Sequence, residues 1–149
     1  MEKTNKITIT CNNWDERVDI SQALADVLKI NMLDIDDYII RGSVMNGDLN
    51  EYSKDAFISE YGENMFSVLE NLSYMAYVKT VEEPFVISLG NLTNESNAPL
   101  FRQTISINVS DGTPALSSVI ADYSVKKEKS TSATAKKIAD IVLTDERWG

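Results

Sequence analysis

Histidine is absent from this chain, which excludes every mechanism that needs a histidine base, a histidine metal ligand or a histidine pH switch. A Ser-His-Asp triad and a typical zinc site are excluded with it. Cys11 is the single cysteine, so no intramolecular disulfide can form and a reducing, cytoplasmic location is expected. No apolar run approaches the length of a membrane span, and the first residues lack the apolar segment of a signal peptide.

Positive charge is also scarce, because 14 Lys and Arg stand against 23 Asp and Glu, for a net charge of −9. Such a surface repels phosphate polyanions, so neither nucleic acid nor a membrane is an expected partner. The apolar fraction of 43% and the charged fraction of 25% are ordinary for a globular protein. The 149 residues suffice for one proper core, and we expect a single domain over residues 1–149.

The pattern of apolar residues predicts strands and helices that alternate along the chain. The expected strands are residues 6–10, 30–34, 85–89, 104–109 and 141–143. The expected helices are residues 20–28, 57–78 and 135–139, and one that begins at Pro114, with a solvated loop over 126–134. This alternation predicts a three-layer α/β/α fold with a mostly parallel central sheet of about five strands.

Ligands of such sheets bind beyond the carboxyl ends of the strands. The predicted strand ends place Cys11–Arg17, Asp34–Asp36 and Leu89–Leu92 around one crevice. We therefore look for the functional residues of this protein in those three segments.

Five segments of the chain occur in an order and at distances that match a known family. They are Gln22–Ala25, Leu33–Asp36, Phe57–Glu70, Val86–Gly90 and Ile138–Asp145. They resemble, in turn, the helix after the P-loop, the Asp-x-Asp strand end, the glycine-glutamate turn, the strand before a triple-glycine turn and the last helix-to-strand segment of the shikimate kinases. The resemblance covers nearly the whole chain and implies the shikimate-kinase-like P-loop NTPase fold.

The segment Cys11–Val18 lies where the resemblance places the P-loop, and it contains no glycine. A P-loop needs glycines so that backbone N–H groups can face phosphates, then a lysine, then a hydroxyl for magnesium. Here Arg17 stands at the lysine position and Val18 at the magnesium-ligand position. Asp15 and Glu16 occupy the positive start of the next helix and stabilise it by ~0.3–1 kcal/mol each. We therefore expect no bound nucleotide and no metal.

The substrate side also departs from the family. Ser67 occupies the position of an arginine that, by the resemblance, holds the substrate carboxylate. The triple-glycine turn is reduced to Gly90-Asn91-Leu92, and no arginine is present between Thr104 and Asp145 to serve a lid. These losses predict that no catalytic residue remains.

Asp34, Asp36 and Gly90 are the residual substrate-side candidates. The resemblance implies that Asp34 helps to organise magnesium and that Asp36 hydrogen-bonds substrate hydroxyls and assists phosphoryl transfer. Such a pair needs dry, positively charged partners, and we expect these partners to be missing. The alternative is that both aspartates end a strand and cap the helix that begins near Asp37. Trp14 is expected to pack at the core or at an edge of it rather than to stack on a ligand.

The leading hypothesis is a catalytically inactive pseudokinase that serves as a binding, regulatory or interaction module without a cofactor. Its expected partners are a second copy of itself, another protein such as an active enzyme of aromatic amino-acid synthesis, or a small metabolite. The alternative is a divergent shikimate kinase or another small-metabolite kinase, which would hold ATP and magnesium with Arg17 as the main phosphate contact. A third hypothesis is an interaction protein with a doubly wound fold unrelated to kinases.

Overall fold

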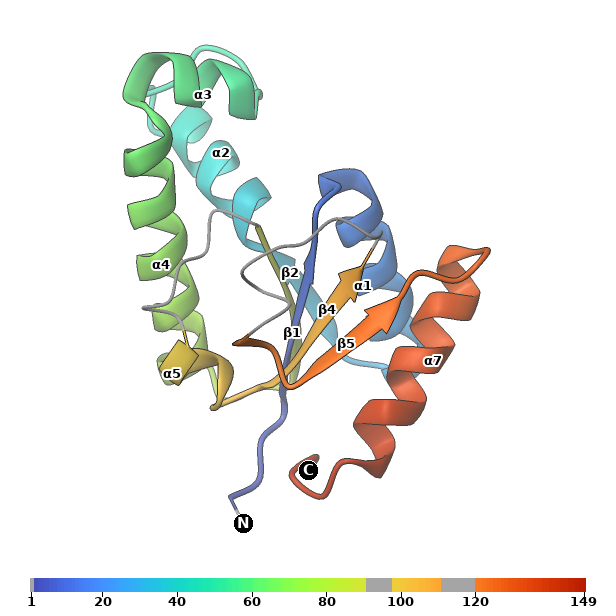
Figure 1. The fold of residues 1–149 in the computed structure, drawn as a ribbon. Coiled ribbons are helices and arrows are strands. Elements are labelled where there is room, and N and C mark those ends of the chain that lie inside the picture. The colour runs from blue at the N-terminus through green and yellow to red at the C-terminus, as the bar shows by residue number, and fades with distance from the viewer. Residues whose placement is uncertain (1, 91–97, 111–119) are drawn as a thin grey trace.

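A computed structural model describes residues 2–90, 98–110 and 120–149. Within them, a five-stranded, all-parallel sheet carries helices on both faces (Figure 1). The strands are β1 Lys6–Cys11, β2 Asn31–Asp34, β3 Phe85–Leu89, β4 Ile105–Ser110 and β5 Tyr123–Lys126, in the order β2-β3-β1-β4-β5. The helices are α1 Trp14–Leu28, α2 Ile35–Met45, α3 Lys54–Tyr61, α4 Glu63–Thr80, α5 Ala98–Phe101 and α7 Thr131–Thr144. The prediction of a three-layer α/β fold is confirmed.

Two apolar clusters fill the two faces of the sheet. One packs α1 and α7 against the strands, with Leu24 and Ile138 among its fully buried residues. The other packs α2, α3, α4 and α5 against the opposite face, with Phe66 and Leu89 among its buried residues. Figure 1 shows this division, with α1 and α7 on one side of the sheet and α2 to α5 on the other. None of the described helices has the length and continuous apolar character that a bilayer span requires.

The central strand β1 is buried along its whole length, as is typical of a parallel strand covered on both faces. Its Thr8 hydroxyl oxygen lies 2.6 Å from Tyr74 Oη and 2.8 Å from Thr104 Oγ1. Each hydroxyl can donate one hydrogen bond and accept others, so the three groups satisfy one another in the interior. This hydroxyl triad connects β1 to α4 and to the residue that precedes β4.

Side-chain caps fix the starts of four helices. Asn13 caps α1, Asp34 caps α2, Ser53 caps α3 and Ser130 caps α7, each accepting from a backbone N–H three residues on. A cap of this kind stabilises a helix by about 1 kcal/mol. The expectation that side chains occupy the start of α1 is therefore confirmed.

The sequence prediction is wrong at the last strand and around it. Residues 141–143 are not a strand but the last turns of α7, where Val142 continues the buried face of Ile138 one turn later. The fifth strand is β5 instead, and the prediction missed it because only Val125 of its four residues is buried. The solvated loop expected over 126–134 is shorter, since α7 already begins at Thr131.

The long helix expected over 57–78 is interrupted. Gly62 has a φ of +91°, a backbone conformation that side chains rarely adopt, and it separates α3 from α4. The helix expected to begin at Pro114 lies outside the described residues, as do Asn91 and Leu92 of the shortened glycine turn.

Candidate functional site

Arg17 is the centre of a buried ion network at the carboxyl ends of β2 and β3. Its side chain, from the first turns of α1, is only 2% exposed. Nη2 donates to Asp36 Oδ2 at 3.0 Å and to Asp34 Oδ1 at 3.4 Å, and Nε donates to Ser88 Oγ at 2.8 Å. A planar guanidinium suits this place because its fixed fork of donors can reach several acceptors at once.

Asp34 ends β2 and caps α2, the position that the structural alternative predicts for it. Its Oδ2 accepts from the backbone N–H of Asp37 at 2.8 Å and from Trp14 Nε1 at 2.8 Å. Its Oδ1 accepts from the Ser88 hydroxyl at 2.6 Å. The carboxylate therefore holds together β2, β3 and the starts of α1 and α2.

Asp36 lies in the first turn of α2, not at the strand end, and is fully buried. Besides Arg17, its Oδ2 accepts from Lys54 Nζ at 2.9 Å. The Lys54 ammonium also lies 4.8 Å from the centre of the Phe66 ring, a cation–π contact. The statement that positive partners are lacking is thus wrong. Lys54 was missed because it is 18 residues away in sequence and follows no pattern that points to Asp36.

Glu70 of α4 is 0% exposed and lies beside Asp36. Burial, a hydrogen bond to Asp36 and the negative charge of Asp36 raise the pKa of Glu70 to about 9. Burial works against ionisation of Asp36, but Arg17, the bond from Glu70 and Lys54 together keep its pKa below the usual range. Two carboxylates cannot hydrogen-bond to each other, so the proton retained by Glu70 supplies the donor.

Gly90 follows β3 and makes room for this carboxyl pair. A Cβ atom at this position would lie 2.4 Å from Glu70 Oε2 and 3.0 Å and 3.1 Å from the two Asp36 carboxylate oxygens. A side chain is therefore excluded unless the carboxyl groups move. The structure brings together Arg17, Asp34, Asp36 and Gly90, the four candidates from the sequence, and adds Lys54, Glu70 and Ser88 to them.

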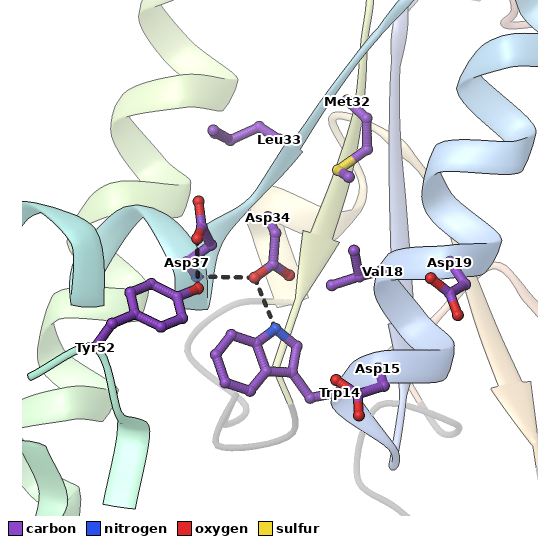
Figure 2. Close-up of a pocket in the computed structure, with 9 residues that line it drawn as sticks. All are labelled: Trp14, Asp15, Val18, Asp19, Met32, Leu33, Asp34, Asp37 and Tyr52. Carbon is purple, nitrogen blue, oxygen red and sulfur yellow. Dashed lines mark hydrogen bonds between the residues drawn. The ribbon is translucent and has the colours of Figure 1, made fainter. Parts of the chain in front are cut away.

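A surface hollow of about 650 Å³ lies beside the network, between α1, β2 and the start of α2. Its lining residues are Trp14, Asp15, Val18, Asp19, Met32, Leu33, Asp34, Asp37 and Tyr52. Figure 2 shows the indole of Trp14 and the phenol of Tyr52 with their polar ends toward the aspartates. Tyr52 Oη donates to Asp37 Oδ1 at 2.5 Å, and burial together with this bond raises the pKa of Tyr52 to about 12. Four of the nine lining residues are aspartates, and none of these nine is a lysine or an arginine.

Trp14 packs against the second apolar cluster, as expected from the sequence, and also forms one wall of this surface hollow. Its half-buried ring keeps the indole N–H bonded to Asp34. Trp14 therefore both packs against the core and lines the hollow.

The start of α1 is occupied by the chain itself. Asn13 Oδ1 accepts from the backbone N–H of Glu16 at 3.0 Å, and the backbone N–H of Arg17 donates to the Asn13 carbonyl at 2.9 Å. Asp15 and Glu16 fill the first turn, and Lys127 from the segment after β5 forms an ion pair with Glu16. The chain itself thus caps the N–H group of Glu16, and the carboxylates of Asp15 and Glu16 offset the positive field that could attract an anion here.

No family model and no curated protein matches the sequence. Solved structures do match in fold. A shikimate kinase from Acinetobacter baumannii, in complex with shikimate, has a TM-score of 0.75 at 15% identity, covering 97% of this chain and 96% of that one. The shikimate kinase of Aquifex aeolicus has a TM-score of 0.71 at 18% identity, covering 93% and 96%. A dephospho-CoA kinase from Campylobacter jejuni is more distant, with a TM-score of 0.52 at 11% identity, covering 93% and 97%. These similarities contradict the hypothesis of a fold unrelated to kinases.

Proposed function

Given its shikimate-kinase-like P-loop fold, we propose that this protein is a pseudokinase that acts by binding and not by phosphoryl transfer. The observation that carries the proposal is the burial of Arg17 among Asp34, Asp36 and Ser88. Arg17 is the one cation at the position where the fold's kinases would need a phosphate contact. Its charge is already paired with two buried carboxylates.

Moving Arg17 to a phosphate would leave the Asp34 and Asp36 carboxylates buried with one cation fewer. Breaking a buried ion pair in this way costs about 3–5 kcal/mol. That cost corresponds to a loss of about two to four orders of magnitude in nucleotide affinity. A nucleotide would therefore need other strong contacts, and Val18 cannot supply the metal-binding hydroxyl.

The charges around Arg17 support the same proposal. An incoming triphosphate would meet Asp15 and Glu16 at the start of α1 and the aspartates of the surface hollow. At the short distances within a binding site, like charges repel with little screening by salt. The module is therefore expected to function without ATP or magnesium.

The substrate side points in the same direction. The Acinetobacter baumannii kinase is described in complex with shikimate, but here Asp36 is enclosed by Arg17, Lys54 and Glu70. A small metabolite with hydroxyl groups would have to displace these partners to reach it. We expect the partner to be a second copy, another protein or a metabolite in the surface hollow, with no role for nucleic acid or a membrane, in a cytoplasmic setting.

One observation favours the alternative, a divergent small-metabolite kinase. Asp36 is dry and lies between two cations, the environment in which a carboxylate could orient a substrate hydroxyl. Catalysis would still require Arg17 to turn outward and contact ATP. The two hypotheses therefore differ in whether the network opens.

Calorimetric titration and thermal unfolding with magnesium-ATP test the proposal directly. A ligand at a hundred times its dissociation constant would stabilise the protein by about 2.7 kcal/mol, and we expect no stabilisation. A phosphoryl-transfer assay with ATP and shikimate should likewise show no product. Genuine activity that disappears in Asp36→Asn would contradict the proposal, whereas activity that survives this substitution identifies a contaminating kinase.

A further inference from the structure

The surface hollow beside the ion network has the size and the lining of a small-molecule site. Its volume of about 650 Å³ is typical of the pockets that hold small ligands. Val18, Met32 and Leu33 supply the apolar part of the lining, and all three are half-buried. Figure 2 shows the side chain of Val18 pointing from α1 toward Asp34. A ligand in this place would contact hydrocarbon as well as polar groups.

Two aromatic side chains complete the lining, and hydrogen bonds hold both in place. Trp14 Nε1 donates to Asp34 at 2.8 Å, and Tyr52 Oη donates to Asp37 at 2.5 Å. Because the polar ends of both side chains are already bonded, they offer a ligand their ring carbons. Aromatic rings attract both hydrocarbon and ammonium groups.

The described cations around the hollow each have an acidic partner already. These ion pairs are Arg17–Asp34, Arg41–Asp37, Lys54–Asp36 and Lys127–Glu16. Two of the four lining aspartates, Asp15 and Asp19, form no ion pair with any described residue. The hollow therefore keeps two uncompensated negative charges after its neighbouring cations are counted.

Asp15 and Asp19 are exposed and lie four residues apart on α1. Residues at this spacing are neighbours on one side of a helix, and like charges there destabilise it slightly. A cation bound between or beside the two carboxylates would remove this repulsion.

The chemistry of the lining favours an organic cation over a metal ion. Within the described ranges, no three acidic or sulfur side chains come close enough together to hold a metal. A metal ion would also leave the apolar side chains and the two rings without a role. An aliphatic chain that carries ammonium groups uses all three parts of the lining.

We propose that the surface hollow binds an aliphatic polyamine. Its ammonium groups lie at Asp15 and Asp19, and its hydrocarbon chain lies against Val18, Met32 and the ring of Trp14. A ligand with two or more ammonium groups suits two carboxylates that stand one helical turn apart. The proposal names the ligand class for the binding role proposed above and rests on that role.

Calorimetric titration of the full chain with spermidine tests the proposal. We expect saturable binding at one site, and we expect Asp19→Asn to weaken it by about fivefold or more. Asp26→Asn is the matched control, because Asp26 is exposed on the same helix, carries the same charge and lies outside the hollow. Absence of binding, or equal weakening by both variants, overturns the proposal.

Two further probes separate the charged part of the ligand from its hydrocarbon. Magnesium chloride supplies positive charge without a chain, and 1,4-butanediol supplies a chain without charge. We expect each to bind at least about tenfold more weakly than spermidine. Magnesium that binds as tightly as spermidine would show that the carboxylates attract any cation, which contradicts the proposal.

The indole N–H signals in NMR spectra locate the site without any charge variant. The chain has two tryptophans, of which Trp14 lines the hollow and Trp148 packs against the cluster of α1 and α7. Spermidine should shift the Trp14 signal and leave the Trp148 signal in place, with Trp148→Phe giving the assignment. A shift of the Trp148 signal alone, or of neither, contradicts this location.

These results are distinct from a failure of the pseudokinase proposal. Absence of spermidine binding overturns the ligand class, and the magnesium-ATP titration still decides whether the chain is a pseudokinase. Phosphoryl transfer by a chain that also binds spermidine in the hollow would overturn the pseudokinase proposal alone.

Discussion

The buried ion network and the outer face of α4 differ in how far other groups of the chain contact their side chains. In the network, Arg17 and Lys54 form ion pairs with the aspartates, and protonated Glu70 donates a hydrogen bond to Asp36. On α4, the apolar side chains of Met65, Val68, Leu72 and Met75, called here the α4 stripe, are between 36% and 52% exposed, and nothing within the described residues covers them. The network would have to open before it could bind anything, whereas the α4 stripe is already exposed. The network is therefore a closed element of the interior, and the α4 stripe is an open surface.

Removing the central cation should break the network and produce the largest effect. Arg17→Met keeps most of the aliphatic stem but leaves Asp34 and Asp36 short of a cation, and we expect a loss of about 3–5 kcal/mol in unfolding free energy. Chemical denaturation measures it. Such a loss is a large part of the total stability of a small domain.

Two controls define the cause of that loss. Arg41→Met removes an exposed ion pair with Asp37, and we expect a change of at most about 0.5 kcal/mol. Arg17→Met combined with Asp36→Asn should cost less than the sum of the two single changes, because the buried charge is removed with its partner. Strict additivity would mean that the two groups are not coupled.

The retained proton of Glu70 should make stability depend on pH. The pKa of this group is about 9 in the folded state against an ordinary value of 4.5, so between these values the folded state keeps a proton that the unfolded state has released. Stability should therefore fall as pH rises, by up to about 1.4 kcal/mol per pH unit from this group alone. Glu70→Gln cannot ionise and should be more stable than the natural protein near pH 8, with the advantage shrinking toward pH 5.

Denaturation curves of both proteins across this pH range provide the measurement. The pKa of Asp36 is lowered in the folded state, so this group makes stability rise with pH in the acid range. Both proteins contain Asp36. Glu63→Gln, at the exposed start of the same helix, serves as the control and should leave the pH dependence unchanged. Parallel curves for Glu70→Gln and the natural protein would show that Glu70 is ionised in the folded state.

A methyl group at Gly90 should disturb the network by crowding instead of by charge. The added carbon would lie 2.4 Å from Glu70 Oε2, so the carboxyl pair must shift, and overpacking of this kind costs about 1–3 kcal/mol. Thermal or chemical denaturation of Gly90→Ala measures it. The Gly42→Ala variant is the control, because nothing lies within 4 Å of the added carbon there. Equal effects at both positions would contradict a specific contact.

The smallest effect is expected on the α4 stripe. Leu72→Ser should change the stability of the single chain by no more than about 0.5 kcal/mol, since the side chain is half exposed. Chemical denaturation measures it. A loss of several kcal/mol would mean that the stripe belongs to the chain's own core.

The sequence predicted the parts of the fold that repeat a simple pattern. Strand β1 and the buried face of α1 follow from the spacing of their apolar residues, and the parallel sheet follows from the alternation of elements. Strand β5 could not be predicted, because a short edge strand with one buried residue leaves almost no pattern. The break at Gly62 was missed because the apolar spacing continues across it.

Four of the seven site residues were predicted from the sequence. Asp34, Asp36, Arg17 and Gly90 were singled out because they lie near predicted strand ends and occupy positions that the resemblance to the shikimate kinases marks. Their roles were not predictable, since the long arm of Arg17 could have pointed outward as easily as inward. Lys54 and Glu70 come from helices far along the chain, and only the folded arrangement brings them to Asp36. Tertiary contacts between distant charges leave no local pattern in a sequence.

The hydroxyl triad of Thr8, Tyr74 and Thr104 has a consequence for α4 as a whole. A helix held only by apolar contacts can rotate a little about its own axis, because such contacts have no direction. Tyr74 Oη lies 2.6 Å from Thr8 Oγ1 of the central strand. This directional bond fixes the rotation of α4 about its own axis. The same bond that orients Glu70 toward Asp36 thereby determines which side chains the helix displays to the outside.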